Sequence, residues 1–384
     1  MDPIVILGAG LAGHAVAREF RRLDPTTPVT MIAADGAEAY SKPMLSTALA
    51  ARRGAAQLAS ADAAKTAGQL AIEIRPRTRV LAIDVAARAL RLDDGAELGY
   101  AKLVLALGAD PRRLALAGDA AGEVLSVNDL DDYAAFREAL EGARRVAILG
   151  AGLIGCEFAN DIASSGRQVV VVDVAALPLG RLLPPRAATR LRDGLGAAGV
   201  AWHLGRVPHA VRRGGDGGAL ALELDDGKTI EADVALSAIG LAPRVALAAA
   251  AGLATGRGVR VDRWLRGSDD RVFALGDCAE VEGLVLPYVM PLMRCARALA
   301  RTLAGTPTPV DYPAMPVVVK TPAMPVVVSP PPPNAAGEWH EEEVGDGIVA
   351  RFAGPDGTGL GFALVGPGAV GLKADLTAGL PSWL

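Results

Sequence analysis

Short runs of apolar and mostly β-branched residues recur along the chain, and a glycine follows several of them directly. Ile4 to Leu7 and Val146 to Leu149 each lead into a glycine-rich turn and then into a stretch that favours a helix. Apolar runs of this length, bounded by turn residues, are typical of strands buried in a parallel sheet. The pattern predicts an α/β fold in which buried strands alternate with helices.

The two glycine-rich turns share the spacing G-x-G-x-x-G, at Gly8, Gly10 and Gly13 and again at Gly150, Gly152 and Gly155. Each turn stands between a predicted strand and a predicted helix, which is the context of a dinucleotide-binding turn. The first glycine permits the tight turn, the second lets a pyrophosphate approach the backbone, and the third lets helix and strand pack closely. A single match could be a turn in an unrelated sheet, but the repeat favours two bound dinucleotides over one dinucleotide and a decayed copy.

An acidic residue follows the second strand of each half. Asp35 comes after Val29–Ala33, and Asp173 comes after Val169–Val172, 18 residues beyond Gly155. A carboxylate about 20 residues beyond the turn binds the ribose hydroxyls. A carboxylate at Asp173 would also repel a 2′-phosphate, so the sequence favours NADH over NADPH. The nearby Arg167 and Arg181 leave the strictness of that preference open.

The duplication extends to a closing strand in each half, and a different composition follows. Lys102–Pro111 and Ala232–Arg244 both read as buried strands halted by glycine and proline, and Asp270–Ala279 ends a further strand at Gly276-Asp277. From Thr306 the chain is rich in proline and carries two V-V-V strands, each opened by Met-Pro. The Pro330–Pro333 run predicts a stiff surface loop.

Composition and charge exclude several classes of protein, among them general nucleic-acid binders and disulfide-rich domains. With 384 residues the chain should form two or three domains, and a formal net charge of −4 argues against a general nucleic-acid binder. Three scattered cysteines do not make a disulfide framework, and the four histidines lack metal-ligand spacing, so no metal site is expected. Neither a signal peptide nor a membrane-spanning run is visible. A cytoplasmic protein is expected.

The order of these motifs resembles that of the two-dinucleotide-binding-domain flavoprotein reductases, over the chain to about residue 305. The resemblance implies FAD on the first turn and NADH on the second. The residues it implies for FAD are Gly8, Gly10, Leu11, Ala12, Gly13, Asp35, Lys42, Pro43, Ala106, Gly108, Gly276, Asp277, Met290, Pro291 and Lys320. Those for NAD are Gly150, Gly152, Leu153, Ile154, Gly155, Glu157, Asp173 and Gly240.

Two Rossmann-like dinucleotide-binding domains and a small C-terminal α+β domain are therefore expected. The FAD domain is predicted at residues 1–112 and 241–305, and it is discontinuous because Gly276-Asp277 must return to the first fold. The NAD domain is predicted at 113–240 and the C-terminal α+β domain at 306–384.

Within that superfamily, the segments around Lys42-Pro43, Glu157, Met290-Pro291 and Lys320 resemble bacterial NADH:rubredoxin reductases, which serve alkane oxidation and oxidative-stress systems. The resemblance implies Lys42 as a catalytic cation beside flavin N5, with Glu157 as its partner and as a group that places the nicotinamide. A helix beginning near Pro291-Leu292 would point its N-terminus at the flavin N1 end. Lys320 would lie beside the flavin pyrimidine or serve only as an edge-strand residue.

The absence of cysteine from one segment bears on the electron acceptor. Residues 40–60 hold no cysteine, whereas disulfide reductases of the superfamily carry a redox-active pair there. Electrons should then pass from FAD directly to rubredoxin, a small acidic iron protein. Arg112, Arg113 and Arg294 could form a basic rim for it, or could be ordinary surface arginines. A reductase of a [2Fe–2S] ferredoxin and an NADH-binding flavoprotein redox sensor stay open as alternatives, and so does the oligomeric state.

Overall fold

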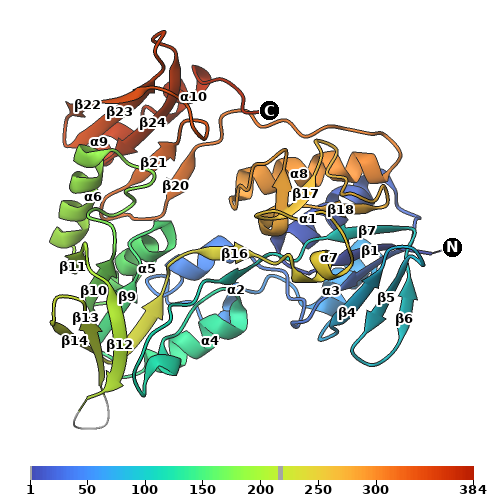
Figure 1. Ribbon diagram of the computed structural model, residues 1–384, viewed down its shortest axis with the longest axis horizontal. Coiled ribbons are helices and arrows are strands. Elements are labelled where there is room, and N and C mark those ends of the chain that lie inside the picture. Colours follow the sequence, from blue (N-terminus) through green and yellow to red (C-terminus); the bar gives the residue numbers. More distant parts are fainter. Residues whose placement is uncertain (1, 215–218) are drawn as a thin grey trace.

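The computed structural model describes residues 2–214 and 219–384. A first parallel sheet has the strand order β18-β7-β1-β2-β3, and its strands β18, β7 and β1 lie side by side in Figure 1. Its strands are β1 (Ile4–Leu7), β2 (Val29–Ile32), β3 (Glu73–Arg75), β7 (Lys102–Leu105) and β18 (Val272–Ala274). Helix α1 (Leu11–Leu23) packs against α8 (Val289–Leu303) beside this sheet. The late strand β18 pairs with β7, so the chain returns to its first sheet as expected.

Smaller elements complete this part of the molecule. An antiparallel sheet is formed by β4 (Val80–Asp84), β5 (Ala89–Leu92) and β6 (Glu97–Gly99), and β17 (Val259–Val261) pairs with β19 (Ala279–Val281). The short helices are η1 (Lys42–Thr47), α2 (Ala55–Leu58), α3 (Ala63–Leu70), α7 (Ala246–Ala250) and η3 (Gly276–Cys278).

A second parallel sheet has the order β11-β10-β9-β15. Its strands are β9 (Arg145–Leu149), β10 (Gln168–Asp173), β11 (Val200–Leu204) and β15 (Val234–Ser237). The helices of this domain are α5 (Leu153–Ser164) and α6 (Pro185–Ala197). Two further helices, η2 (Ala121–Glu123) and α4 (Leu130–Ala139), precede β9 in the chain. An antiparallel sheet of β12 (Pro208–Arg213), β13 (Leu220–Leu224) and β14 (Thr229–Ala232) lies beside it. The strand, turn, helix and strand of the first part therefore recur.

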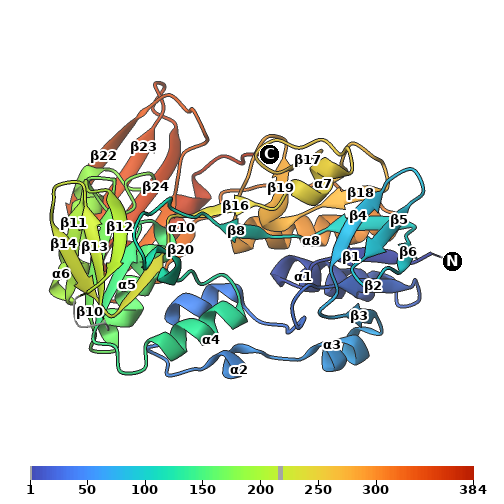
Figure 2. The same cartoon turned by 60° about the horizontal axis from the view of Figure 1, so that its bottom comes forward.

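Two short strands connect the parallel-sheet domains. β8 (Ala109–Pro111) and β16 (Leu241–Pro243) pair in antiparallel fashion, and they run between the two domains in both views (Figures 1 and 2). These strands lie close to residues 112 and 240, where the domain boundaries are predicted. The exact domain limits stay a prediction. The chain therefore crosses between the domains twice, side by side.

The C-terminal part is a five-stranded antiparallel sheet with the order β20-β21-β24-β23-β22. Its strands are β20 (Val317–Val319), β21 (Val326–Ser329), β22 (Glu338–Val344), β23 (Gly347–Ala353) and β24 (Gly359–Val365), followed by α9 (Pro367–Val370) and α10 (Lys373–Ala378). The two V-V-V runs form the predicted strands and pair with each other. The fold prediction of two dinucleotide-binding domains and a smaller α+β domain is confirmed.

The cores show which parts pack together. One cluster fills the first domain around α1, β1, β7 and α8. A second joins α5 and α6 to one face of the C-terminal sheet, including Val319, Val326 and Val365. The C-terminal sheet thus shares a core with the second domain. Within residues 2–214 and 219–384, no helix combines the length and apolar character needed to cross a membrane.

Candidate functional site

The first glycine-rich turn joins β1 to α1 by close backbone contact. Gly8 has φ of +111°, and a Cβ built on it would lie 2.2 Å from the Ala106 carbonyl oxygen. A Cβ on Gly13 would lie 1.9 Å from the carbonyl oxygen of Gly8, whereas one on Gly10 would meet no atom within 4 Å. The free space is therefore in front of Gly10, where the first N–H groups of α1 have no partner within the helix and attract a phosphate.

The second turn repeats this geometry between β9 and α5. Gly150 has φ of +112°, and its Cβ would lie 2.6 Å from the Ala238 carbonyl oxygen, while the space around Gly152 is open within 4 Å. The Asp173 carboxylate accepts hydrogen bonds from the backbone N–H groups of Ala151 and Ala175. Asp173 is thus held against the turn, at the edge where a ribose would lie.

The late Gly276-Asp277 pair closes onto the first turn. Gly276 has φ of +77°, and a Cβ there would lie 2.9 Å from the Cβ of Ala12. Burial raises the pKa of Asp277, and the positive charge of Lys42 opposes that rise. Gly276 therefore lies against the start of α1, and the Asp277 carboxylate is close enough to Lys42 to be affected by its charge, although these residues are separated widely in the sequence.

Lys42 is held by a residue that the sequence did not single out. Its Nζ donates a hydrogen bond to Asn128 Oδ1 at 2.7 Å, and Asn128 Nδ2 donates to the Ala109 carbonyl oxygen at 3.0 Å. Burial lowers the pKa of Lys42, and the negative charge of Asp277 is the largest effect in the opposite direction. The amide of Asn128 fixes the ammonium group in place.

The expected Lys42–Glu157 pair is wrong. The Glu157 carboxylate, only 2% exposed, accepts hydrogen bonds from the Lys320 backbone N–H at 3.0 Å and from Ser46 Oγ at 2.6 Å, and it forms an ion pair with Lys320 Nζ. Lys42 and Ser46 lie on one 3₁₀ helix of three residues per turn, so side chains four apart point in different directions. Ser46 faces α5, while Lys42 faces Asn128.

The same contacts correct the interpretation of Lys320 as only an edge-strand residue. Its ammonium group is engaged with Glu157 and with Ser46 Oγ at 3.0 Å, so it is not merely an exposed edge-strand residue. Neither Ser46 nor Asn128 carried a sequence signal of its own, because a single serine or asparagine has no spacing to test.

The remaining predicted residues line the two turns and the connecting strands. Leu11 and Ala12 lie in the first turn of α1, and Leu153 and Ile154 in that of α5. Asp35 follows β2 and accepts the Ala37 N–H at 3.0 Å, and Pro43 lies in η1. Gly108 and Gly240 both have positive φ and flank β8 and β16, and Ala106 contacts Gly8.

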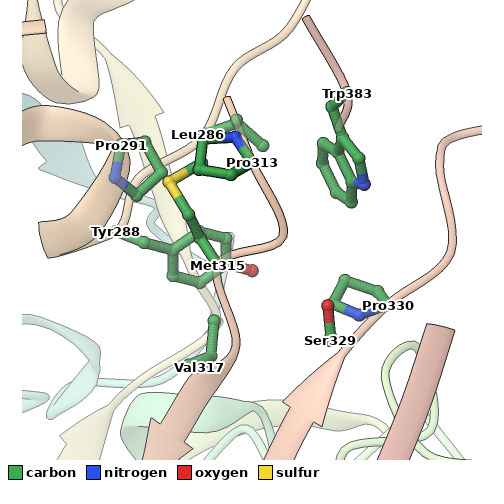
Figure 3. A pocket seen from close by; sticks show the side chains of 9 residues that line it. All are labelled: Leu286, Tyr288, Pro291, Pro313, Met315, Val317, Ser329, Pro330 and Trp383. Atoms are coloured by element: carbon green, nitrogen blue, oxygen red, sulfur yellow. The ribbon is translucent and has the colours of Figure 1, made fainter. Parts of the chain in front are cut away.

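Helix α8 begins at Val289, slightly earlier than predicted, with Met290 exposed and Pro291 buried. Pro291 also lines a small, largely apolar pocket between the first domain and the C-terminal part. In Figure 3, Tyr288, Pro291 and Met315 lie on one side of this pocket and Trp383 on the other. The backbone N–H of Trp383 donates to the Tyr312 carbonyl oxygen at 2.7 Å, which holds the tail against the first domain.

The three arginines considered for a docking rim lie on different elements. Arg112 and Arg113 are exposed just after β8, and Arg294 on α8 forms an ion pair with Asp311 at 3.0 Å. Because Asp311 neutralises Arg294, Arg112 and Arg113 are the better candidates. The rim stays a prediction.

The three cysteines are all buried and free. Burial raises the pKa of each thiol, to about 11 for Cys278 and Cys295. A thiol with a raised pKa is a poor nucleophile near neutral pH, because the thiolate is the reactive form. These cysteines do not provide a dithiol relay.

His14 makes a pH-dependent contribution to stability that can be measured. It is 4% exposed on α1, and its two ring nitrogens have no hydrogen-bond partner among the described residues. Burial, aided by Arg18, lowers its pKa. The folded protein therefore binds a proton at His14 less readily than the unfolded chain, which protonates it below about pH 6.5. Its contribution is complete above that pH and is lost as the pH falls.

We expect the free energy of unfolding of His14→Phe to fall less steeply between pH 7 and 5 than that of the parent. Urea unfolding at several pH values measures this slope. Parallel curves for the two proteins would show that His14 does not titrate on unfolding.

The geometry defines a class of protein. Two open glycine turns, each at an uncapped helix N-terminus, fit two dinucleotides, and the Asp277–Lys42 arrangement closing onto the first turn fits FAD there. The structure is that of an oxidoreductase with two dinucleotide-binding domains, using FAD and NADH.

Comparison with known proteins agrees with this class. The family described as pyridine nucleotide-disulphide oxidoreductase matches residues 2–300, and the rubredoxin binding C-terminal domain matches residues 309–380. The chain belongs to the pyridine nucleotide-disulphide oxidoreductase family. It is 50% identical to a rubredoxin-NAD(+) reductase of Alcanivorax borkumensis, covering 100% of this chain and 99% of that protein. It is 46% identical to the enzyme of that name from Acinetobacter baylyi, covering 99% and 98%.

Solved structures share the architecture. The covalent putidaredoxin reductase–putidaredoxin complex superposes with a TM-score of 0.89 at 26% identity, covering 99% of this chain and 94% of that one. A ferredoxin reductase from Rhodopseudomonas palustris gives 0.86 at 29% identity, covering 95% and 91%. The expected resemblance and the expected cofactors are confirmed.

Proposed function

We propose that this protein is an NADH:rubredoxin reductase, which takes a hydride from NADH and delivers single electrons to rubredoxin. The observation that carries the proposal is the match of residues 309–380 to a rubredoxin binding domain, within a chain similar to rubredoxin-NAD(+) reductases from end to end. Rubredoxin as the partner agrees with the sequence-based prediction.

The residues of the chain have separate tasks in this reaction. The N-terminus of α1 would hold the FAD pyrophosphate, and Asp277 on η3 would hold a further part of FAD. The N-terminus of α5 binds the NADH pyrophosphate, and Asp173 binds its ribose. Lys42, held by Asn128, would supply a positive charge to bound FAD. Bound FAD supplies the chemistry that accepts a hydride and releases single electrons.

The role of Asp173 can be tested separately from FAD binding. We expect Asp173→Ala to raise the KM for NADH about tenfold or more, because hydrogen bonds to a charged group contribute about 1.5–3 kcal/mol. The FAD content, measured from the visible absorbance of the purified protein, should not change. Loss of FAD in this variant would mean that the two dinucleotide sites have been exchanged.

The acceptor is tested by following NADH oxidation with a rubredoxin and, in parallel, with a [2Fe–2S] ferredoxin, at low and high salt. We expect fast turnover with rubredoxin that slows as salt rises, because complementary charges speed association. Preference for the ferredoxin would contradict the proposal while leaving the cofactors unchanged.

A ferredoxin acceptor is the second candidate, since solved ferredoxin reductases resemble this chain over nearly its whole length. Their identity is lower than that of the rubredoxin-NAD(+) reductases, which favours rubredoxin. Flavin reduction by NADH without turnover on either acceptor would instead support a redox sensor.

The cellular setting is also part of the proposal. A cytoplasmic location agrees with three free, buried cysteines, since disulfides are rare in reducing compartments. A role in alkane oxidation stays a prediction from the sequence resemblance.

A further inference from the structure

One face of α5 holds two other parts of the chain. Asp161 accepts the backbone N–H groups of Leu49 at 3.0 Å and Ala50 at 2.9 Å, and Asn160 Oδ1 accepts the Ala323 N–H at 3.0 Å. Both acceptors are buried, and they lie three and four residues after Glu157, which puts all three on one helical face. The segment that follows Lys42 and the hairpin of the C-terminal sheet therefore meet on α5.

Glu157 lies where these segments come together. Ser46 comes from η1 of the first domain, Glu157 from α5 of the second, and Lys320 from the end of β20, which lies beside α5 in both views (Figures 1 and 2). The two carboxylate oxygens receive the Lys320 N–H, the Lys320 ammonium and the Ser46 hydroxyl. Removing one partner of a buried ion pair is strongly destabilising, because the other charge is left buried and uncompensated.

The C-terminal sheet is also attached to α6. The Glu341 carboxylate on β22 accepts the N–H groups of Arg186 at 3.2 Å and Ala187 at 2.7 Å, so it caps the start of α6. These contacts, together with the shared core, join the C-terminal part to the second domain. Lys320 extends the attachment, because its ammonium group also reaches Ser46 Oγ on η1.

The segment η1 carries Lys42 as well as Ser46. A shift of η1 would move the Lys42 ammonium relative to Asn128, which is held by the Ala109 carbonyl oxygen, and relative to Asp277 on η3. The contacts of Ser46, Leu49 and Ala50 with α5 therefore set where Lys42 lies.

We propose that Lys320 is a positioning residue for the flavin site. Lys320 belongs to the partner-binding C-terminal domain, and its contacts with Glu157 and Ser46 hold η1 in place. Because η1 carries Lys42, these contacts also set the position of Lys42 beside the flavin. This inference rests on the FAD and NADH sites of the proposed function, but not on rubredoxin being the acceptor.

The test uses FAD-loaded Lys320→Met protein without any electron acceptor. We expect flavin reduction by NADH, followed by stopped-flow absorbance, to slow about ten- to a hundredfold, since small misplacements of reacting groups have effects of this size. The visible absorption bands of the bound flavin should shift, because the position of a nearby charge changes. Lys65→Met on α3, an exposed lysine, is the control and should match the parent.

A double-variant cycle separates positioning from simple destabilisation. Glu157→Gln in the Lys320→Met background removes the uncompensated charge, so it should restore stability to urea. The reduction rate should stay low and the flavin spectrum shifted, because the Lys320 contact with Ser46 on η1 is still missing. Lys320→Arg, which keeps a cation, should recover part of both. If Lys320→Met fails to fold, the double variant and Glu157→Gln alone are compared with the parent by the same two measurements.

Parent-like flavin spectra and reduction rates in Lys320→Met, with lowered stability only, would overturn the proposal. The same result in the folded double variant and in Glu157→Gln, should Lys320→Met not fold, would also overturn it. Failure of rubredoxin as an acceptor would leave these measurements unaffected, so the two proposals fail independently.

Discussion

Asp277→Ala is expected to purify with little FAD, because the carboxylate belongs to the element that closes the first dinucleotide site. Gly276 brings η3 against Ala12 on the first turn of α1, and the positive charge of Lys42 favours the ionised form of Asp277. Hydrogen bonds to a charged group contribute about 1.5–3 kcal/mol, which corresponds to FAD binding roughly ten- to a hundredfold weaker.

Titration of the apoprotein with FAD measures this change. Asp270→Ala, at an exposed acid just before β18, is the matched control and should bind FAD as the parent does. Full FAD occupancy in Asp277→Ala, with an unchanged dissociation constant, would remove Asp277 from the cofactor site.

Gly8→Ala is expected to unfold the first turn and to lose FAD entirely. Gly8 has φ of +111°, and the added methyl group would lie 2.2 Å from the Ala106 carbonyl oxygen. A strained backbone costs about 1–3 kcal/mol and overpacking a further 1–3 kcal/mol, so the free energy of unfolding should fall by about 2–6 kcal/mol. Urea unfolding and the FAD content of the purified protein measure the two effects.

Gly10→Ala is the informative companion to this variant. A Cβ at Gly10 meets no protein atom within 4 Å, so the apoprotein should keep its stability. The methyl group would still occupy the space through which the pyrophosphate approaches the backbone, and FAD should bind more weakly. Equal stability of Gly8→Ala and Gly10→Ala apoproteins would contradict the close-contact argument.

The features of this protein that can be predicted from the sequence are those whose chemistry is local. Gly8 and Gly150 have almost the same positive φ, and each contacts the neighbouring strand in the same way. A turn of this kind needs glycine at fixed spacing between a strand and a helix, and all of that information lies within about ten residues. The V-V-V strands of the C-terminal sheet were predictable for a similar reason.

Side chains whose partners lie far apart in the chain are not paired correctly from the sequence. Lys42 was expected to bind Glu157, but its ammonium group binds Asn128, and Glu157 pairs with Lys320. Lys42 and Ser46 point in different directions because η1 is a 3₁₀ helix. Their spacing alone does not show this, because it depends on the type of helix. The resemblance to a family named Lys42 and Glu157 but did not give the partners that their side chains bind.

The sequence alone determined the two dinucleotide turns, the acids that follow them, the return of the chain at Gly276-Asp277 and the kind of protein that these features imply. Local backbone requirements and hydrophobic patterns are written in neighbouring residues, so they can be read without the fold. Only the tertiary structure decided that the C-terminal sheet shares a core with α5 and α6, and that Glu157 joins three parts of the chain. Those contacts depend on which surfaces meet after folding, and a buried carboxylate takes whichever cation the packing brings to it.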